Sequence, residues 1–106
     1  MKWKVSFLPE AIDDLKKLDR SQQILVNKAI LKVSTNPLPQ SEGGYGKPLG
    51  NKGGRNLSGL MKIKLKDAGL RVVYTLVRTE TEMLIIVVGA RKDEEVYEAA
   101  KRRMGK

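Results

Sequence analysis

The stretch that decides the predicted fold is Leu60–Tyr74, LMKIKLKDAGLRVVY. In its first half apolar residues and lysines alternate, and a period of two is typical of a β-strand. Asp67 and Gly69 then provide turn chemistry, since glycine takes positive φ without a Cβ clash. β-Branched and aromatic residues follow as far as Tyr74. The stretch therefore predicts a β-hairpin with one apolar face and one basic face.

The register of this hairpin follows from the same pattern. If the loop runs from Lys66 to Gly69, three apolar pairs face each other: Leu65 and Leu70, Ile63 and Val72, Met61 and Tyr74. A shift by one residue would turn apolar side chains to the wrong face. The favoured register sets Arg71 opposite Lys64, with Lys62 on the same face. Opposed like charges destabilise a sheet, so this basic face is either simply solvated or has an anionic partner.

Length and charge restrict the class of protein. The 106 residues are predicted to form one domain, 1–106, with a single modest core. Residues 1–46 carry seven basic and five acidic side chains, whereas residues 47–106 carry 14 and seven, and the whole chain is +9. Such asymmetry favours a nucleic acid or an acidic protein as partner. The longest apolar run, Met83–Val88, is too short to span a bilayer, and no signal peptide is apparent, so we expect no membrane partner and a cytoplasmic location.

The chain contains no cysteine and no histidine. It therefore has no disulfides, and it lacks the usual zinc ligands and the usual general base near neutral pH. We expect neither a metal nor a cofactor, and any acid–base chemistry must use Lys, Arg, Tyr or carboxylates. Asp13 and Asp14 are adjacent on a predicted helix and point in different directions, so we interpret them as part of a solvated face.

The other elements follow in order along the chain. Residues 2–8 predict a strand, and residue 9 begins the first of two short helices. Asp19 or Ser21 can cap the second helix. Its apolar stripe is predicted to consist of four residues: Leu25, Ala29, Ile30 and Val33. Met83–Val88 is apolar on both faces and belongs in the middle of the sheet, and Asp93 can cap a closing helix.

A Gly/Pro-rich segment, residues 36–59, joins the second helix to the hairpin. We predict a loop anchored by Leu49 and Leu57. It lacks the flanking strand and helix and the Gly-Lys-Ser/Thr ending of a phosphate-binding P-loop. Lys47, Lys52 and Arg55 can bind a phosphate backbone or serve only solubility.

The fold class predicted from this order is α+β, β-α-α-β-β-β-α. It has a four-stranded, antiparallel-rich sheet, a helical hairpin on one face and a C-terminal helix.

Several of these motifs together resemble the RelE/ParE superfamily of toxin–antitoxin toxins, in particular its RelE branch. That branch has a Lys-x-Lys strand, an arginine seven residues later before a Val/Leu-Val-Tyr run, an arginine after a Val-Gly strand end, and a tyrosine six residues further on. The corresponding residues here are Lys62, Lys64, Arg71, Arg91 and Tyr97. The middle segment is longer and richer in glycine than the branch leads us to expect.

The resemblance implies a ribosome-dependent messenger-RNA endonuclease that uses the 2′-OH as nucleophile. Like charges make a lysine easier to deprotonate, so we expect Lys64 to be the general base, with Lys62 as the substitute. Arg71 is expected to hold the phosphate, and Arg91 the phosphate or the leaving oxygen. Tyr97 is expected to stack on a base or assist with the 2′-OH proton; alternatively it is a half-buried helix residue and Arg91 a strand-end cation. Further RNA contacts are expected at six cations: Lys47, Lys52, Arg55, Lys66, Lys92 and Lys101.

The resemblance also implies partners. The first partner is the ribosome with its messenger RNA, and the second is an acidic antitoxin. The toxin is expected to contact operator DNA only through the antitoxin. Two alternatives on the same fold remain: a ParE-like toxin that inhibits DNA gyrase, and an inert nucleic-acid-binding module.

Overall fold

The computed structural model describes residues 3–52, 55–89 and 93–105, and these form one α+β architecture. The elements, in chain order, are β1 (Lys4–Phe7), α1 (Pro9–Lys16), α2 (Arg20–Ser34), β2 (Lys47–Lys52), β3 (Arg55–Leu65), β4 (Leu70–Val77), β5 (Glu82–Gly89) and α3 (Asp93–Arg103). Short 3₁₀ turns follow α2 and β4, at Gln40–Glu42 and Arg78–Glu80. The predicted class is confirmed, but the sheet has five strands where four were expected.

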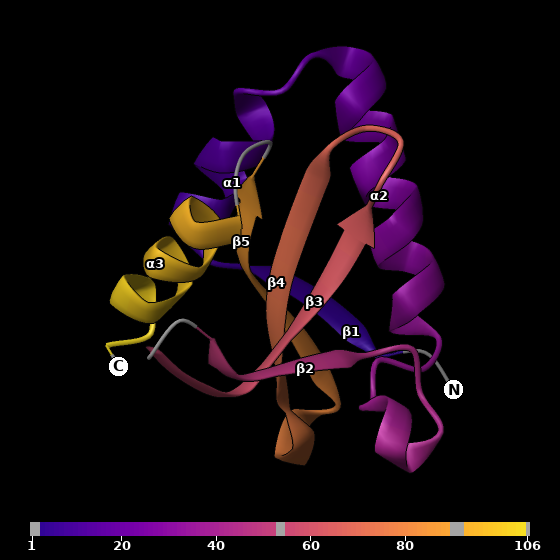
Figure 1. The fold of residues 1–106 in the computed structure, drawn as a ribbon. Helices are drawn as coiled ribbons and strands as arrows, with labels where there is room; N and C mark the ends of the chain where they lie inside the picture. The colour runs from indigo at the N-terminus through magenta and orange to yellow at the C-terminus, as the bar shows by residue number, and fades with distance from the viewer. Residues whose placement is uncertain (1–2, 53–54, 90–92, 106) are drawn as a thin grey trace.

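The sheet has the strand order β1-β5-β4-β3-β2 (Figure 1). β1 runs parallel to β5, and the other neighbours are antiparallel. β5 therefore lies inside the sheet, as the apolar run Met83–Val88 predicted. The register of β3 and β4 is the predicted one, with Lys64 opposite Arg71. Gly69 in the turn has φ +66°, which a side chain would disfavour.

The additional strand, β2, lies in the Gly/Pro-rich segment for which the sequence predicts a loop. β2 pairs with β3 from Arg55 to Lys62, with an irregularity between Pro48 and Gly50. Gly50 has φ +59° there, and both residue types suit a bulged edge strand. The loop prediction was wrong because Gly, Pro and Asn weaken the local strand signal, while pairing with β3 supplies the order. The anchoring role of Leu49 and Leu57 is confirmed, since both are buried.

The helical hairpin begins and packs largely as expected. Asp19 caps α2 by accepting from the backbone N–H of Gln22 at 2.8 Å, and Gln22 returns the bond to form a capping box. The predicted stripe is wrong at one position. Leu25 remains 46% exposed, and Val26 takes its place in the core with Ile30 and Val33. The buried stripe therefore consists of Val26, Ile30 and Val33, which are spaced i, i+4 and i+7 as on one face of a helix.

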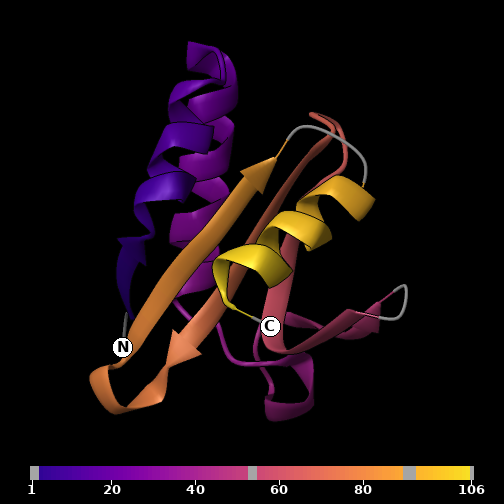
Figure 2. The same cartoon turned by 90° about the vertical axis from the view of Figure 1, so that its left-hand side faces the viewer.

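The helices cover both faces of the sheet. Figure 2 shows α1 and α2 on one side and α3 on the other. Each side has its own cluster of buried residues, one beneath α1 and α2 and one beneath α3. Among the described helices, none combines the length and the apolar character that a membrane crossing requires.

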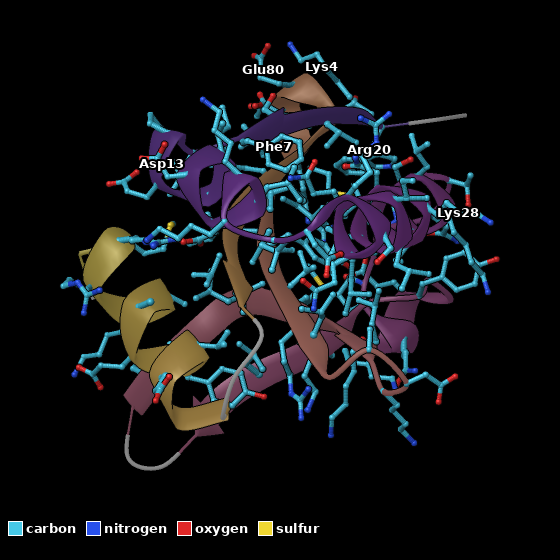
Figure 3. All side chains as sticks on the ribbon, turned by 90° about the horizontal axis from the view of Figure 1, so that it is seen from above. Lys4, Phe7, Asp13, Arg20, Lys28 and Glu80 are labelled. Atoms are coloured by element: carbon cyan, nitrogen blue, oxygen red, sulfur yellow. The ribbon has the colours of Figure 1, made fainter. Side chains whose placement is uncertain are left out.

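One ion pair joins α1, β5 and α3. Arg103 donates to both carboxylate oxygens of Asp14, at 2.6 and 3.1 Å, and to the carbonyl of Ile86 at 2.9 Å. The N–H of Val88 donates to the same carboxylate at 3.1 Å. The assignment of Asp14 to a solvated face was therefore wrong. Only its neighbour Asp13 points outward (Figure 3).

Candidate active site

The cationic residues singled out in the sequence lie on adjacent strands. Lys64 of β3 is directly opposite Arg71 of β4, and Lys62 lies two residues back along β3 on the same face. Arg71 is also opposite Gly89, the last residue of β5. Lys64 is exposed, and the other two cations are half-buried. The three positive charges therefore gather where β3 and β5 end and β4 begins; Lys62, Lys64 and Arg71 are called the cationic patch below.

The strand alternation shows which face the patch occupies. Leu60 and Val73 share the face of Lys62 and Arg71, and both belong to the cluster of buried residues beneath α3. The patch thus extends the α3 face of the sheet beyond its apolar part. Arg91 follows β5 closely in sequence, but Arg91 and Lys92 lie outside the described residues.

Gly89 allows α3 to approach the end of β5. A Cβ placed on Gly89 would come within 2.6 Å of Cγ2 of Val96. Val96 is buried against the sheet, so this side chain has little space into which to move. The glycine of the Val-Gly strand end therefore permits close packing of the helix that carries Tyr97.

Tyr97 lies on the α3 face but is not displayed on the surface. Its side chain is 5% exposed and packs in the cluster that contains Val73 and Ile86. Stacking on a nucleobase requires an accessible ring face, which this packing covers. Of the two roles named for Tyr97, assistance in proton transfer requires less exposure.

The six cations expected to bind RNA are spread over the molecule. Lys47 is directly opposite Lys62, so it extends the cationic patch to β2, and Lys66 is exposed in the turn after β3. Lys52 and Arg55 pair in register at the far end of the same two strands. Lys101 is half-buried in the last turn of α3, and Lys92 lies outside the described residues. Within the described part of the chain, only Lys47 and Lys66 adjoin the patch.

Two residues near the patch were not identified from the sequence. Tyr45 is 49% exposed, and Nζ of Lys32 lies 5.7 Å from the centroid of its ring. Both line an open pocket together with Lys47, Lys62 and Lys64. The available signal was an aromatic residue between two glycines in a segment otherwise poor in large side chains. Lys32 has no such signal, because it is one exposed lysine among others on α2.

The chain was compared with known proteins. No model of a protein family matches it. A protein of Escherichia coli described as RelE-like toxin protein is 29% identical over 105 residues, which are 98% of this chain and 99% of that protein. A mutant of the E. coli toxin RelE, solved in the free state, is 26% identical with a TM-score of 0.75, covering 98% of this chain and 99% of the other. The RelBE2 toxin–antitoxin complex of Mycobacterium tuberculosis contains a chain that is 26% identical with a TM-score of 0.69, covering 88% and 95%.

In fold and in sequence the chain is similar, over nearly its whole length, to the RelE-like toxins, with the E. coli toxin RelE among the similar solved structures.

Proposed function

We propose that this RelE-like toxin is an endoribonuclease that cleaves messenger RNA on the ribosome, without a metal ion, and is inhibited by an acidic antitoxin. The observation that carries the proposal is the cationic patch, in which Lys64 is directly opposite Arg71 with Lys62 beside them. Opposed like charges lower the stability of a sheet, and an anion between them offsets that cost. A phosphodiester is the anion that fits the family resemblance.

The proposed reaction is transesterification within the RNA. The 2′-oxygen forms a bond to the adjacent phosphorus, and the bond from phosphorus to the 5′-oxygen breaks, which leaves a 2′,3′-cyclic phosphate and a 5′-hydroxyl. Lys64 takes the 2′-OH proton as general base, and Lys62 is the substitute. Arg71 donates two hydrogen bonds to the non-bridging oxygens as their charge develops. The departing 5′-oxygen takes a proton from water or from the lysine that received the 2′-OH proton, so the protons balance over the reaction.

Two further residues are assigned roles through the family resemblance. Arg91 stabilises the phosphate or the leaving oxygen. Tyr97, which is buried between α3 and the sheet, assists with the 2′-OH proton and does not stack on a nucleobase. Both roles require α3 and the end of β5 to stay in place against the sheet.

The ribosome is proposed to position the substrate. Free RNA rarely holds the 2′-oxygen in line with the leaving oxygen, and correct orientation alone can contribute about 7–11 kcal/mol to catalysis. The net charge of +9 favours association with ribosomal RNA, which is a dense polyanion.

The antitoxin is proposed because the similar chain of M. tuberculosis was solved in a toxin–antitoxin complex. A partner that covers the cationic patch would gain most from acidic side chains. Any contact with operator DNA is assigned to the antitoxin.

The test is a translating extract with a reporter messenger RNA. The wild type is expected to cut within ribosome-bound codons. Lys64→Ala is expected to lose more than about tenfold in rate, and Arg71→Ala and Arg91→Ala should abolish cleavage. Lys16→Ala is the matched control, because Lys16 is an exposed lysine on α1; it should cleave like the wild type.

Other results would separate the alternatives. DNA damage without messenger cleavage would support a ParE-like action on gyrase and contradict the proposal. Full cleavage by Lys64→Ala would refute the assignment of the general base while leaving the nuclease activity in place.

A further inference from the structure

An open pocket lies at the edge of the sheet beside the cationic patch. Among the described strands, β2 pairs with β3 from Arg55 to Lys62, and the last part of β3 continues beyond it. The pocket lies next to this part, has a volume of about 280 Å³, and is walled on its apolar side by Val33 of α2 together with Ile63 and Leu65 of β3. Its size suits one nucleotide or one side chain better than a larger ligand.

The rim of the pocket is strongly positive. Lys32 reaches it from α2, Lys47 from β2, and Lys64 from β3. Within the described part of the chain, none of these three lysines forms an ion pair. Lys47 also lies directly opposite Lys62 on β3. This is a second pair of opposed like charges, in addition to Lys64 and Arg71. Such a concentration of charge favours an anionic ligand.

Tyr45 gives this pocket an aromatic wall that is held in place. Its backbone N–H donates to the carbonyl of Asn36 at 3.0 Å, and that of Gly46 donates to the carbonyl of Leu38 at 2.9 Å. Gly44 is equally confined, since a Cβ there would lie 2.0 Å from the Leu38 oxygen. The ring therefore stands half-exposed on a backbone that is fixed on both sides. An exposed aromatic side chain on a fixed backbone is suited to stacking on an unpaired base.

We propose that this pocket is a subsite for one nucleotide of single-stranded RNA, with Tyr45 stacking on the base and Lys32 and Lys47 holding the neighbouring phosphates. The aromatic ring and the apolar walls suit the base of a nucleotide, and the cations at the rim suit its phosphate. An acidic protein segment would use the cations but would not need the ring. That the nucleotide lies next to the scissile phosphate rests on the proposed function, because the pocket shares Lys62 and Lys64 with the cationic patch.

The experiment measures RNA binding in the absence of the ribosome. The probe is a short, fluorescently labelled single-stranded RNA with 2′-O-methyl groups, which lacks the nucleophile and cannot be cut. Tyr45→Ser is expected to weaken binding by at least about fivefold, and Tyr45→Phe, which keeps the ring, by less than about twofold. The same variants should bind a duplex RNA like the wild type, because its bases are already paired.

The lysines are tested by their salt dependence. Lys32→Ala should weaken binding and make it less dependent on salt, since one phosphate contact is lost. Lys16→Ala makes the same change in net charge at an exposed position on α1, outside the residues that line the pocket, and should have a smaller effect. Circular dichroism of each variant checks that the fold is retained.

Three other outcomes decide between the subsite and its alternatives. Equal RNA binding by Tyr45→Ser and the wild type overturns the subsite, whether or not the wild type cleaves messenger RNA in the extract. If Tyr45→Ser weakens binding of an acidic peptide but not of RNA, the result also overturns the RNA subsite and supports a site for an acidic protein segment. Binding that depends on Tyr45 without any messenger cleavage in the extract supports the subsite and contradicts the proposed function.

Discussion

Replacing Arg103 with methionine is expected to destabilise the fold by about 3 kcal/mol. Arg103 forms a two-pronged ion pair with Asp14, and both side chains are largely buried, with 15% and 14% of their surfaces exposed. In the variant, the carboxylate of Asp14 would keep only the hydrogen bond from the N–H of Val88. Removal of one partner of a buried pair leaves a charge without compensation and costs about 3–5 kcal/mol. The residual exposure to solvent favours the lower end of that range.

This loss corresponds to a large shift in melting temperature. The entropy of unfolding is about 2.1 cal/mol/K per residue, or roughly 0.22 kcal/mol/K for this chain. A loss of 3 kcal/mol therefore lowers the melting temperature by about 13 °C. The carbonyl of Ile86 also loses its hydrogen bond from Arg103, so the end of α3 should loosen from β5 as well.

The assay is urea and thermal unfolding, followed by circular dichroism. Two neighbouring residues provide matched controls. Arg102→Met removes a positive charge, as Arg103→Met does, at an exposed position in the same helical turn. Asp13→Asn removes a negative charge, as Asp14→Asn does, at the exposed neighbour of Asp14. Both should change the free energy of unfolding by less than about 0.5 kcal/mol. The double variant Asp14→Asn with Arg103→Met should be more stable than the sum of the single effects predicts.

Two results would contradict this reasoning. One is a loss below about 1 kcal/mol in Arg103→Met, which is the range of an exposed pair. The other is strict additivity in the double variant, which would show that the two side chains do not stabilise the fold through each other.

Three further predictions concern packing and pH. Gly46→Ala should cost about 1–3 kcal/mol in urea unfolding, because its Cβ would lie 2.6 Å from Sδ of Met61 and 2.7 Å from the hydroxyl of Tyr74; wild-type stability would show that the loop simply shifts. Tyr97→Ala should cost about 3–5 kcal/mol but Tyr97→Phe only about 1, so only the phenylalanine variant tests the hydroxyl in cleavage assays. The N–H of Gln22 holds the pKa of Asp19 below its usual range. The folded state therefore binds this proton less readily than the unfolded chain, and the stabilisation present near neutral pH is lost on acidification. Asp19→Asn should flatten that part of the stability curve, and an unchanged acid slope would contradict the argument.

The hairpin of β3 and β4 could be predicted in detail. Its turn residues are adjacent in sequence, and the alternation of apolar and polar residues permits only one register that buries all three apolar pairs. The cationic patch could also be predicted from the sequence, because that register places Lys64 opposite Arg71. Burial of Tyr97 could not be predicted in the same way, because it depends on how α3 packs against Val73 and Ile86 of the sheet.

Features that depend on neighbours along the chain can be predicted from residue order: the strand periods, the Asp19 cap, the turn at Gly69 and the basic face of β3. Three other features depend on contacts in the folded chain: β2 is a strand, Asp14 meets Arg103 across 89 residues, and Tyr45 lies beside Lys32 and Lys47. The physical reason is that these contacts form between segments with weak or ambiguous local signals. Their free energy comes from pairing, burial and charge in the folded chain, which no short window of sequence contains.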